Sequence, residues 1–142
     1  MLPALLLGTG LLLASLLSFA VAIALVVSLM SRVIRTGYSE ESFWSNVAIM
    51  IFITLVLAPA HLTEIALWAT AFRASSEIST FEKAFYFSAQ NYTALGYGDI
   101  ALSDRWRLLG PLEAINGLLL FGLSTAAMFA ALSRLVSGRL HS

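Results

Sequence analysis

Apolar residues fill three stretches of the chain that are each long enough to cross a membrane. The first lies within residues 5–30, the second within 46–72 and the third within 108–133. A helix of about 20 predominantly apolar residues crosses the roughly 30 Å hydrocarbon core of a bilayer. The pattern therefore predicts three membrane-spanning helices.

A fourth apolar and aromatic segment, residues 83–92, is too short to span a bilayer. It follows Ser79-Thr-Phe-Glu82, a capping-box pattern that starts a helix, and it leads directly into Gly96-Tyr-Gly98. Irregular backbone at membrane depth is tolerated only where it is buried in protein or lines a watery path. We therefore expect a re-entrant or surface half-helix over residues 80–92, followed by a loop with a function.

Composition supports a membrane protein and excludes several other classes. Hydrophobic residues make up 59% of the 142 residues and charged residues only 11%, whereas soluble domains are roughly half apolar and a quarter charged. The net charge is zero and no run of Lys or Arg offers a surface for nucleic acid, which is not an expected partner. There is no Cys for disulfides or thiolate metal sites. No nucleophile motif is present, so we do not expect an enzyme.

The loop segment carries a resemblance to a known family. Thr93-Ala-Leu-Gly-Tyr-Gly-Asp99 resembles the potassium-channel signature, Thr-Thr-Val-Gly-Tyr-Gly-Asp in its common form. The segment Gly117-Leu-Leu-Leu-Phe-Gly-Leu-Ser-Thr-Ala-Ala127 is similar to the inner helix of the small proton-gated bacterial potassium channels. The chain thus looks like a member of the potassium-channel pore-loop family, the two-transmembrane ion channels, over roughly residues 46–133.

The resemblance implies an all-α membrane protein that assembles with identical subunits as a homotetramer around a central pore. The pore domain would be residues 46–133, with outer helix 46–72, pore helix 80–92, filter 93–99 and inner helix 108–133. An additional N-terminal transmembrane helix would lie in residues 1–35, a cytoplasmic linker in 36–45 and a short cytoplasmic tail in 134–142. The expected location is the lipid of a cell membrane, with a bacterial inner membrane favoured, the N-terminus outside and the C-terminus in the cytoplasm.

The expected substrate is the potassium ion, which permeates without an organic cofactor. Rings of backbone carbonyls can replace the hydration shell of this ion, and glycine allows successive carbonyls to point the same way. The resemblance assigns this role to the filter residues Ala94, Leu95, Gly96, Tyr97 and Gly98. It assigns support of the filter to Thr93, Asp99, Gln90 and Tyr86, since an amide N–H and a phenol O–H can both donate to the Asp99 carboxylate.

The matched inner helix would direct one face toward the pore. Four residues at intervals of three, four and four trace this face: Leu118, Phe121, Thr125 and Phe129. We expect Phe129 to form a dewetting constriction that acts as the gate. Gly117 or Gly122 would be a hinge, or would instead be small to let neighbouring membrane helices approach.

Two departures from the family pattern concern selectivity. The usual filter threonine is Ala94 here, and the usual valine is Leu95. Without the threonine hydroxyl, we expect weaker occupancy of the innermost ion site and relaxed selectivity. Two alternatives to a potassium channel therefore stay open: a weakly selective monovalent cation channel, and a non-conducting accessory membrane subunit, which the additional first span favours.

Three ionisable residues lie inside the predicted spans. Such residues are functional candidates by default. His61 and Glu64 share one helix face, and two ligands make a poor metal site, so the pattern favours a hydrogen-bonding pair near the membrane boundary. Glu113 begins the last span and is expected to anchor helices behind the filter rather than to contact ions.

Overall fold

The computed structural model describes residues 1–35 and 43–139, and every regular element within these ranges is an α-helix. Helix α1 comprises Leu2–Arg35, α2 Phe43–Ala74, α3 Phe81–Tyr92 and α4 Leu109–Arg139. Most of the predicted linker 36–45 and the end of the predicted tail 134–142 fall outside the described residues.

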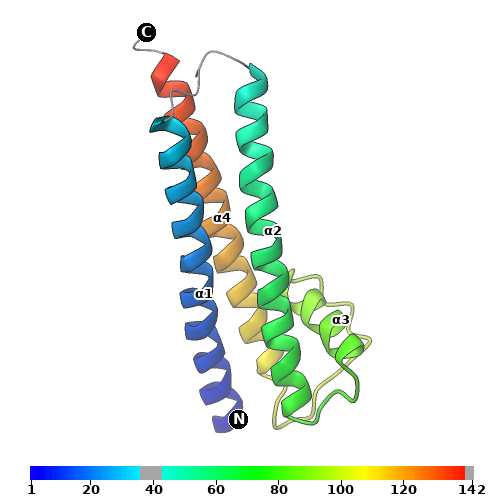
Figure 1. Cartoon of the computed structure of the whole chain (residues 1–142). Helices are drawn as coiled ribbons and strands as arrows, with labels where there is room; N and C mark the ends of the chain where they lie inside the picture. The colour runs from blue at the N-terminus through cyan, green and yellow to red at the C-terminus, as the bar shows by residue number, and fades with distance from the viewer. Residues whose placement is uncertain (36–42, 140–142) are drawn as a thin grey trace.

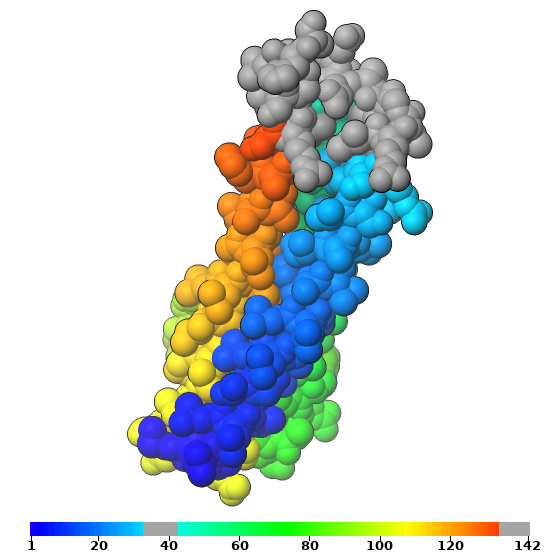
Figure 2. All heavy atoms as spheres, turned by 90° about the vertical axis from the view of Figure 1, so that its left-hand side faces the viewer, coloured from blue at the N-terminus to red at the C-terminus, as the bar shows by residue number. Residues whose placement is uncertain are grey.

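The three long helices lie side by side, and the short helix α3 packs at one end of this bundle (Figure 1). Helices α1 and α4 run in the same direction and α2 runs in the opposite one. The N-terminus therefore lies at the end of the bundle that holds α3, and α4 ends at the other. Seen from its α1 side, the molecule shows α1 lying across the bundle between α4 and α2 (Figure 2).

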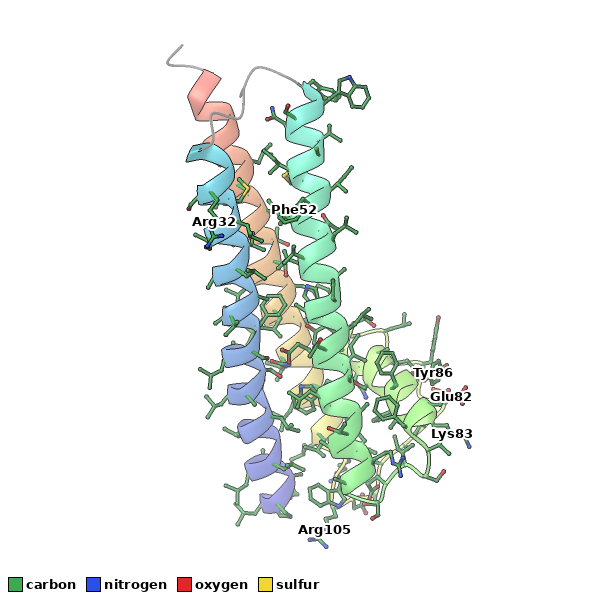
Figure 3. The ribbon with its side chains drawn as sticks, viewed as in Figure 1. Arg32, Phe52, Glu82, Lys83, Tyr86 and Arg105 are labelled. Carbon is green, nitrogen blue, oxygen red and sulfur yellow. The ribbon has the colours of Figure 1, made fainter. Side chains whose placement is uncertain are left out.

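Helices α1, α2 and α4 are long and apolar enough to cross a membrane. Many of their large apolar side chains point outward, such as Leu17 on α1, which is 72% exposed. Large exposed apolar surfaces are uncommon on soluble monomers, whereas lipid tails accommodate them. Labelled charged residues lie near the two ends of the bundle, with Arg32 at one end and Lys83 and Arg105 at the other (Figure 3). The chain is a multi-pass membrane protein.

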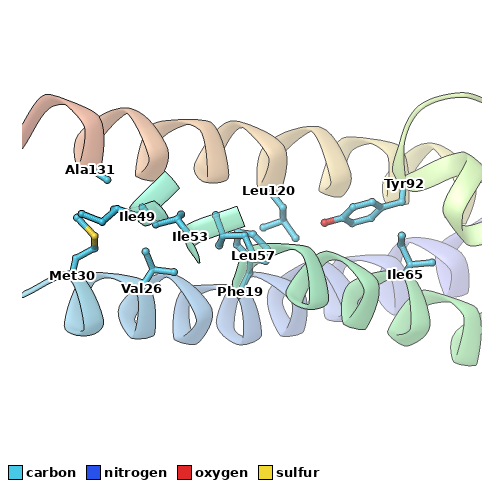
Figure 4. Packing of buried hydrophobic residues seen from close by; sticks show 10 residues of the cluster. All are labelled: Phe19, Val26, Met30, Ile49, Ile53, Leu57, Ile65, Tyr92, Leu120 and Ala131. Atoms are coloured by element: carbon cyan, nitrogen blue, oxygen red, sulfur yellow. The ribbon is translucent and has the colours of Figure 1, made fainter. Parts of the chain in front are cut away.

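Two clusters of buried apolar side chains hold the helices together. One runs along the middle of the bundle and joins α1, α2 and α4 with the ring of Tyr92, which reaches in from the end of α3 (Figure 4). The other fixes α3 to the end of the bundle, and its largest fully buried members are Trp68, Phe72 and Leu109. Burying such side chains contributes about 1.5–3 kcal/mol each where the alternative is water.

A small residue of α1 faces the first turns of α4. A Cβ atom at Gly8 of α1 would lie 2.4 Å from Cδ1 of Leu112 on α4. Small residues let membrane helices approach each other closely. Gly8 therefore helps to bring α1 against the first turns of α4.

Candidate functional site

The caps of helix α3 fix where the helix starts and where the candidate loop begins. Its N-cap is Thr80, whose side chain accepts a hydrogen bond from the backbone N–H of Lys83, and Glu82 places an acid in the first turn. Both features stabilise a helix start because they satisfy or complement free N–H groups. The helix ends at Tyr92. The backbone N–H and the hydroxyl of the next residue, Thr93, both donate to the carbonyl of Ala89, at 3.1 and 2.8 Å. The chain then leaves the helix as an irregular loop.

Every second residue of this loop has a positive φ. The values are +56° at Ala94, +55° at Gly96 and +77° at Gly98. Glycine adopts this left-handed region freely, whereas an alanine there costs roughly 1–2 kcal/mol. When left-handed and right-handed residues alternate, successive peptide groups point in the same direction. The anion-binding nests formed by backbone N–H groups have this arrangement. The backbone therefore has a repeat of two residues that differs from both helix and strand.

The carbonyl groups of this loop accept no hydrogen bond from the residues that the structure describes. The backbone N–H groups of Ala94, Leu95 and Gly96 donate back to carbonyls of α3, at 2.8, 2.8 and 3.3 Å. In contrast, none of the carbonyls of residues 94–98 accepts a hydrogen bond from the described part of the chain. These residues are all exposed, including Leu95 at 55% and Tyr97 at 69%. Five consecutive carbonyls are thus free to meet a ligand or another subunit.

The end of the loop is attached to α3 through Asp99. The amide Nε2 of Gln90 donates to Oδ1 of Asp99 at 3.1 Å. Tyr86 lies beside the same carboxylate, and its pKa is raised by desolvation and by the charge of Asp99, so it keeps its proton and remains a donor at neutral pH. Both side chains that the sequence expectation places around Asp99 are therefore close to it.

The start of the loop is attached through Tyr92, which is completely buried. Its hydroxyl lies 2.7 Å from Nδ1 of His61 on α2. Its ring packs edge-on against Phe121 of α4, with the ring centroids 5.4 Å apart. Its backbone carbonyl lies so close to Gly117 of α4 that a Cβ there would be 1.9 Å from the oxygen. Burial raises the pKa of the Tyr92 hydroxyl, which stays protonated.

The predicted pore face of α4 is open in the single subunit. Leu118, Phe121, Thr125 and Phe129 are all exposed, and Phe129 is 69% exposed. The ring of Phe121 also stacks on the imidazole of His61, with the centroids 4.6 Å apart. The face therefore has room for contacts that one subunit does not supply.

Helix α1 packs on the other side of α4. Small and apolar residues of α4, including Leu123 and Ala127, face Ile23 and Met30 of α1 across an apolar cavity of about 310 Å³. Two positions along an α-helix are about 200° apart. Leu123 and Ala127 each lie two positions from Thr125, so α1 covers the face opposite the predicted pore face.

The two candidate hinge glycines have different surroundings. Gly117 is buried and a side chain there would collide with the backbone of Tyr92. Gly122 is exposed, and a Cβ there would meet nothing within 4 Å. Close packing is thus a sufficient reason for glycine at position 117, whereas the subunit itself gives no packing reason at position 122.

Comparison with known families decides the class of this site. A family model described as an ion channel matches residues 60–134, which is more than half of the chain. The chain belongs to the ion channel family. The match begins midway along α2 and includes α3, the loop and most of α4. Helix α1 lies outside it, and the chain has no match among curated proteins or solved structures.

Membership in this family indicates that the chain takes part in ion conduction across a membrane. Among the described residues of this ion channel chain, no group of three or more His, Asp or Glu side chains could hold a metal ion. The loop offers five exposed backbone carbonyls that accept no hydrogen bond from the described part of the chain.

The channel chain also contains buried polar contacts that the sequence alone does not reveal. His61 and Glu64 do not form the expected pair at the membrane boundary but bond to different helices: His61 to Tyr92 and Ser124, and Glu64 to Ser18 of α1. Glu64 is 2% exposed. Their three-residue spacing signals a shared helix face, but partners from other helices are not visible in a local pattern.

Glu113 has the anchoring position expected of it. The hydroxyl of Ser88 in the middle of α3 donates to the carbonyl of Ile65 on α2 at 2.7 Å, and the same oxygen is in hydrogen-bond contact with the carboxyl group of Glu113. Both Ser88 and Glu113 are completely buried. A single serine therefore joins α2, α3 and α4 behind the loop.

Proposed function

We propose that the chain forms a tetrameric pore that conducts monovalent cations, with potassium preferred, through the loop of residues 93–99. In this proposal α3 is a re-entrant pore helix, and the carbonyls of residues 94–98 line the filter. One subunit supplies only one wall of such a pore, so four identical chains are needed to surround an ion. The observation that carries the proposal is a run of five exposed carbonyls, without partners among the described residues, on a backbone with positive φ at every second residue.

The packing of α1 supports conduction over an accessory role. An extra span that covered the pore face of α4 would favour a subunit that cannot form a pore. Helix α1 instead contacts the opposite side, and Leu118, Thr125 and Phe129 stay open. In the proposed tetramer these residues line the cavity, and Phe129 forms the constriction.

The proposed orientation follows from the position of α3. In this orientation, the end of the bundle with α3 and the N-terminus faces outward and the end of α4 faces the cytoplasm. The proposed membrane is the cell membrane, and the resemblance favours a bacterial inner membrane. An accessibility assay on single cysteines introduced at the first and last residues of the chain tests this orientation.

Ion flux into liposomes that contain only the purified full-length chain tests the proposed function. We expect uptake driven by gradients of potassium, with sodium and caesium compared in parallel, and chemical cross-links that reach a tetramer. The absence of flux for every cation, in vesicles where the chain is folded and inserted, would favour the accessory subunit. Cross-links that stop at dimers would contradict the pore geometry.

A weakly selective cation channel is the second candidate, and Ala94 is the observation that favours it. A hydroxyl-bearing residue would add a ring of oxygen ligands at the innermost site, which alanine lacks. The positive φ of Ala94 makes Thr a poor test, because β-branched residues are strongly disfavoured there. Serine supplies the hydroxyl without the branch.

We therefore predict that Ala94→Ser raises the ratio of potassium to sodium permeability, by about tenfold if the new oxygens contribute about 1.4 kcal/mol to selection. Ala94→Gly is the matched control, because it relieves the backbone without adding an oxygen. Reversal potentials in two-ion gradients measure both variants. Equal ratios in wild type, Ala94→Ser and Ala94→Gly would show that this ring does not set selectivity.

A further inference from the structure

The imidazole of His61 lies where all four helices meet. It is on α2, and its ring nitrogens lie 2.7 Å from the hydroxyl of Tyr92 on α3 and 2.9 Å from Oγ of Ser124 on α4. Its faces contact aromatic rings, with Phe121 of α4 stacked at 4.6 Å and Phe19 of α1 tilted at 4.9 Å between centroids. Each ring nitrogen therefore bonds to a different helix, and aromatic rings enclose the group between them.

The hydrogen bonds around this ring determine where its proton lies. The hydroxyl of Ser124 donates to the carbonyl of Leu120 at 3.0 Å, so its single proton is already used. It can then only accept from His61, which requires a proton on Nε2. The Nδ1 atom is left as the acceptor for the Tyr92 hydroxyl. The network is complete with one neutral tautomer of His61, and each donor faces an acceptor.

The position of Tyr92 connects this network with the loop. Tyr92 is the last residue of α3, and the loop begins at the next residue. Its ring and its hydroxyl are held by α4 and α2, and its carbonyl is held against Gly117. Tyr92 therefore joins α2 and α4 to the first residue of the loop.

We propose that His61 is a positioning residue for conduction: its neutral imidazole, with the proton on Nε2, holds Tyr92 at the start of the loop to Ser124 on α4. The inference rests on the proposed function, because positioning of the loop has a measurable effect only in a conducting pore. His61 does not contact ions; it acts through Tyr92. Phe19 covers one face of the ring, which gives α1 a part in the arrangement although it lies outside the family match.

The tautomer is measured on the wild-type chain, so this part of the test needs no variant. Full-length protein labelled with ¹⁵N-histidine is reconstituted in lipid vesicles, and solid-state NMR reports which ring nitrogens carry protons. We expect a protonated Nε2 and an unprotonated Nδ1 at neutral pH, assigned by the loss of these signals in His61→Phe. A proton on Nδ1, alone or with one on Nε2, would overturn the proposal.

A double-mutant cycle measures the coupling between the two partners. Tyr92→Phe removes only the hydroxyl and Ser124→Ala only the Oγ atom, so the aromatic packing stays. If both act through His61, each single variant lowers the ratio of potassium to sodium permeability by about fivefold and the double variant by no more. Independent effects would multiply to about 25-fold. Multiplication, or single variants with the wild-type ratio, would overturn the proposal.

The matched control is Thr63→Val, two residues from His61 on α2. In the described part of the chain, the hydroxyl of Thr63 bonds only within its own helix, to the carbonyl of Pro59 at 2.9 Å, and the side chain is exposed. This variant should keep the wild-type permeability ratio. A lower ratio in it would show that any loss of a side-chain hydrogen bond in α2 changes the ratio. A wild-type chain that carries no ion overturns the proposed function and this inference together. A conducting wild type with multiplying effects overturns the inference alone.

Discussion

The two ends of the candidate loop are attached to the bundle in different ways. At its start, Tyr92 is completely buried and is held by His61, Phe121 and Gly117 from two spanning helices. At its end, Asp99 is exposed and is attached to Gln90 of α3 itself. The contacts of Tyr92 at the start thus come from two spanning helices, whereas the side-chain hydrogen bond of Asp99 at the end comes from the short helix that carries the loop.

This difference indicates which part of the loop the fold of one subunit determines. A buried polar group that loses its partner costs about 1–3 kcal/mol, whereas an exposed one can bond to water instead. The position of Ala94, two residues after Tyr92, therefore depends on contacts inside the subunit. In the proposed tetramer, the position of Gly98, next to Asp99, would depend more on contacts with neighbouring subunits.

The largest expected effect is at the buried end, in Gly117→Ala. The new Cβ would lie 1.9 Å from the carbonyl oxygen of Tyr92, which cannot move without shifting α3 against α4. Overpacking of this kind typically costs 1–3 kcal/mol, and we expect about 3 kcal/mol because the colliding atom is backbone. Thermal unfolding in detergent measures the loss of stability, and liposome flux measures the loss of conduction.

Gly122→Ala is the control for this variant. Position 122 is on the same helix, and a Cβ there meets nothing within 4 Å in the subunit. Alanine favours a helix over glycine by about 1 kcal/mol, so the variant should be as stable as wild type or more stable. If Gly117→Ala unfolded at the same temperature as Gly122→Ala, the close approach of Tyr92 to α4 would be contradicted. Retained stability with lost flux in Gly122→Ala would support a hinge at this position.

A smaller effect is expected at the middle of α3, in Ser88→Ala. The change removes the hydroxyl that bonds to Glu113 and to the carbonyl of Ile65, and it leaves both without this partner in a buried site. We expect a loss of about 2 kcal/mol in the free energy of unfolding. Ser31→Ala is the control, because within the described residues the hydroxyl of Ser31 bonds only to the carbonyl of Val27 in its own helix. Equal unfolding midpoints for the two variants would show that α3 does not depend on Ser88.

Local signals in the sequence were sufficient for the helices of this channel. Apolar stretches predict the three spans, and the capping pattern before residue 83 predicts a short helix over 80–92, where the structure has Phe81–Tyr92. The loop and its carbonyl role came from the resemblance of residues 93–99 to a family signature. These features could be predicted because each depends on residues that are neighbours in the chain.

The support of the loop could not be predicted in the same way. The contact between His61 and Tyr92 joins residues 31 positions apart, and the contact between His61 and Ser124 joins residues 63 apart. Such pairings depend on how the helices are rotated against each other, which an apolar pattern alone leaves open. Gly117 shows the same limit, because its chemistry suits a hinge and a close contact equally well, and only the distance to Tyr92 distinguishes them.

The smallest effect on stability is expected at the exposed end, in Gln90→Leu. The change keeps the volume but removes the amide that donates to Asp99, and water can replace that donor. We expect a loss of at most about 1 kcal/mol in the free energy of unfolding, together with a changed permeability ratio if Asp99 sets the end of the filter.

Gln90→Glu sharpens the test, because two carboxylates at this distance repel until one binds a proton, which raises the pKa of one of them. Its stability should therefore be lower than that of wild type at neutral pH and should recover as the pH falls, whereas Gln90→Leu should show no such recovery. Unfolding midpoints measured from neutral to acidic pH test both variants. A Gln90→Glu variant whose stability does not change with pH would show that residue 90 and Asp99 are not in contact in the assembled channel.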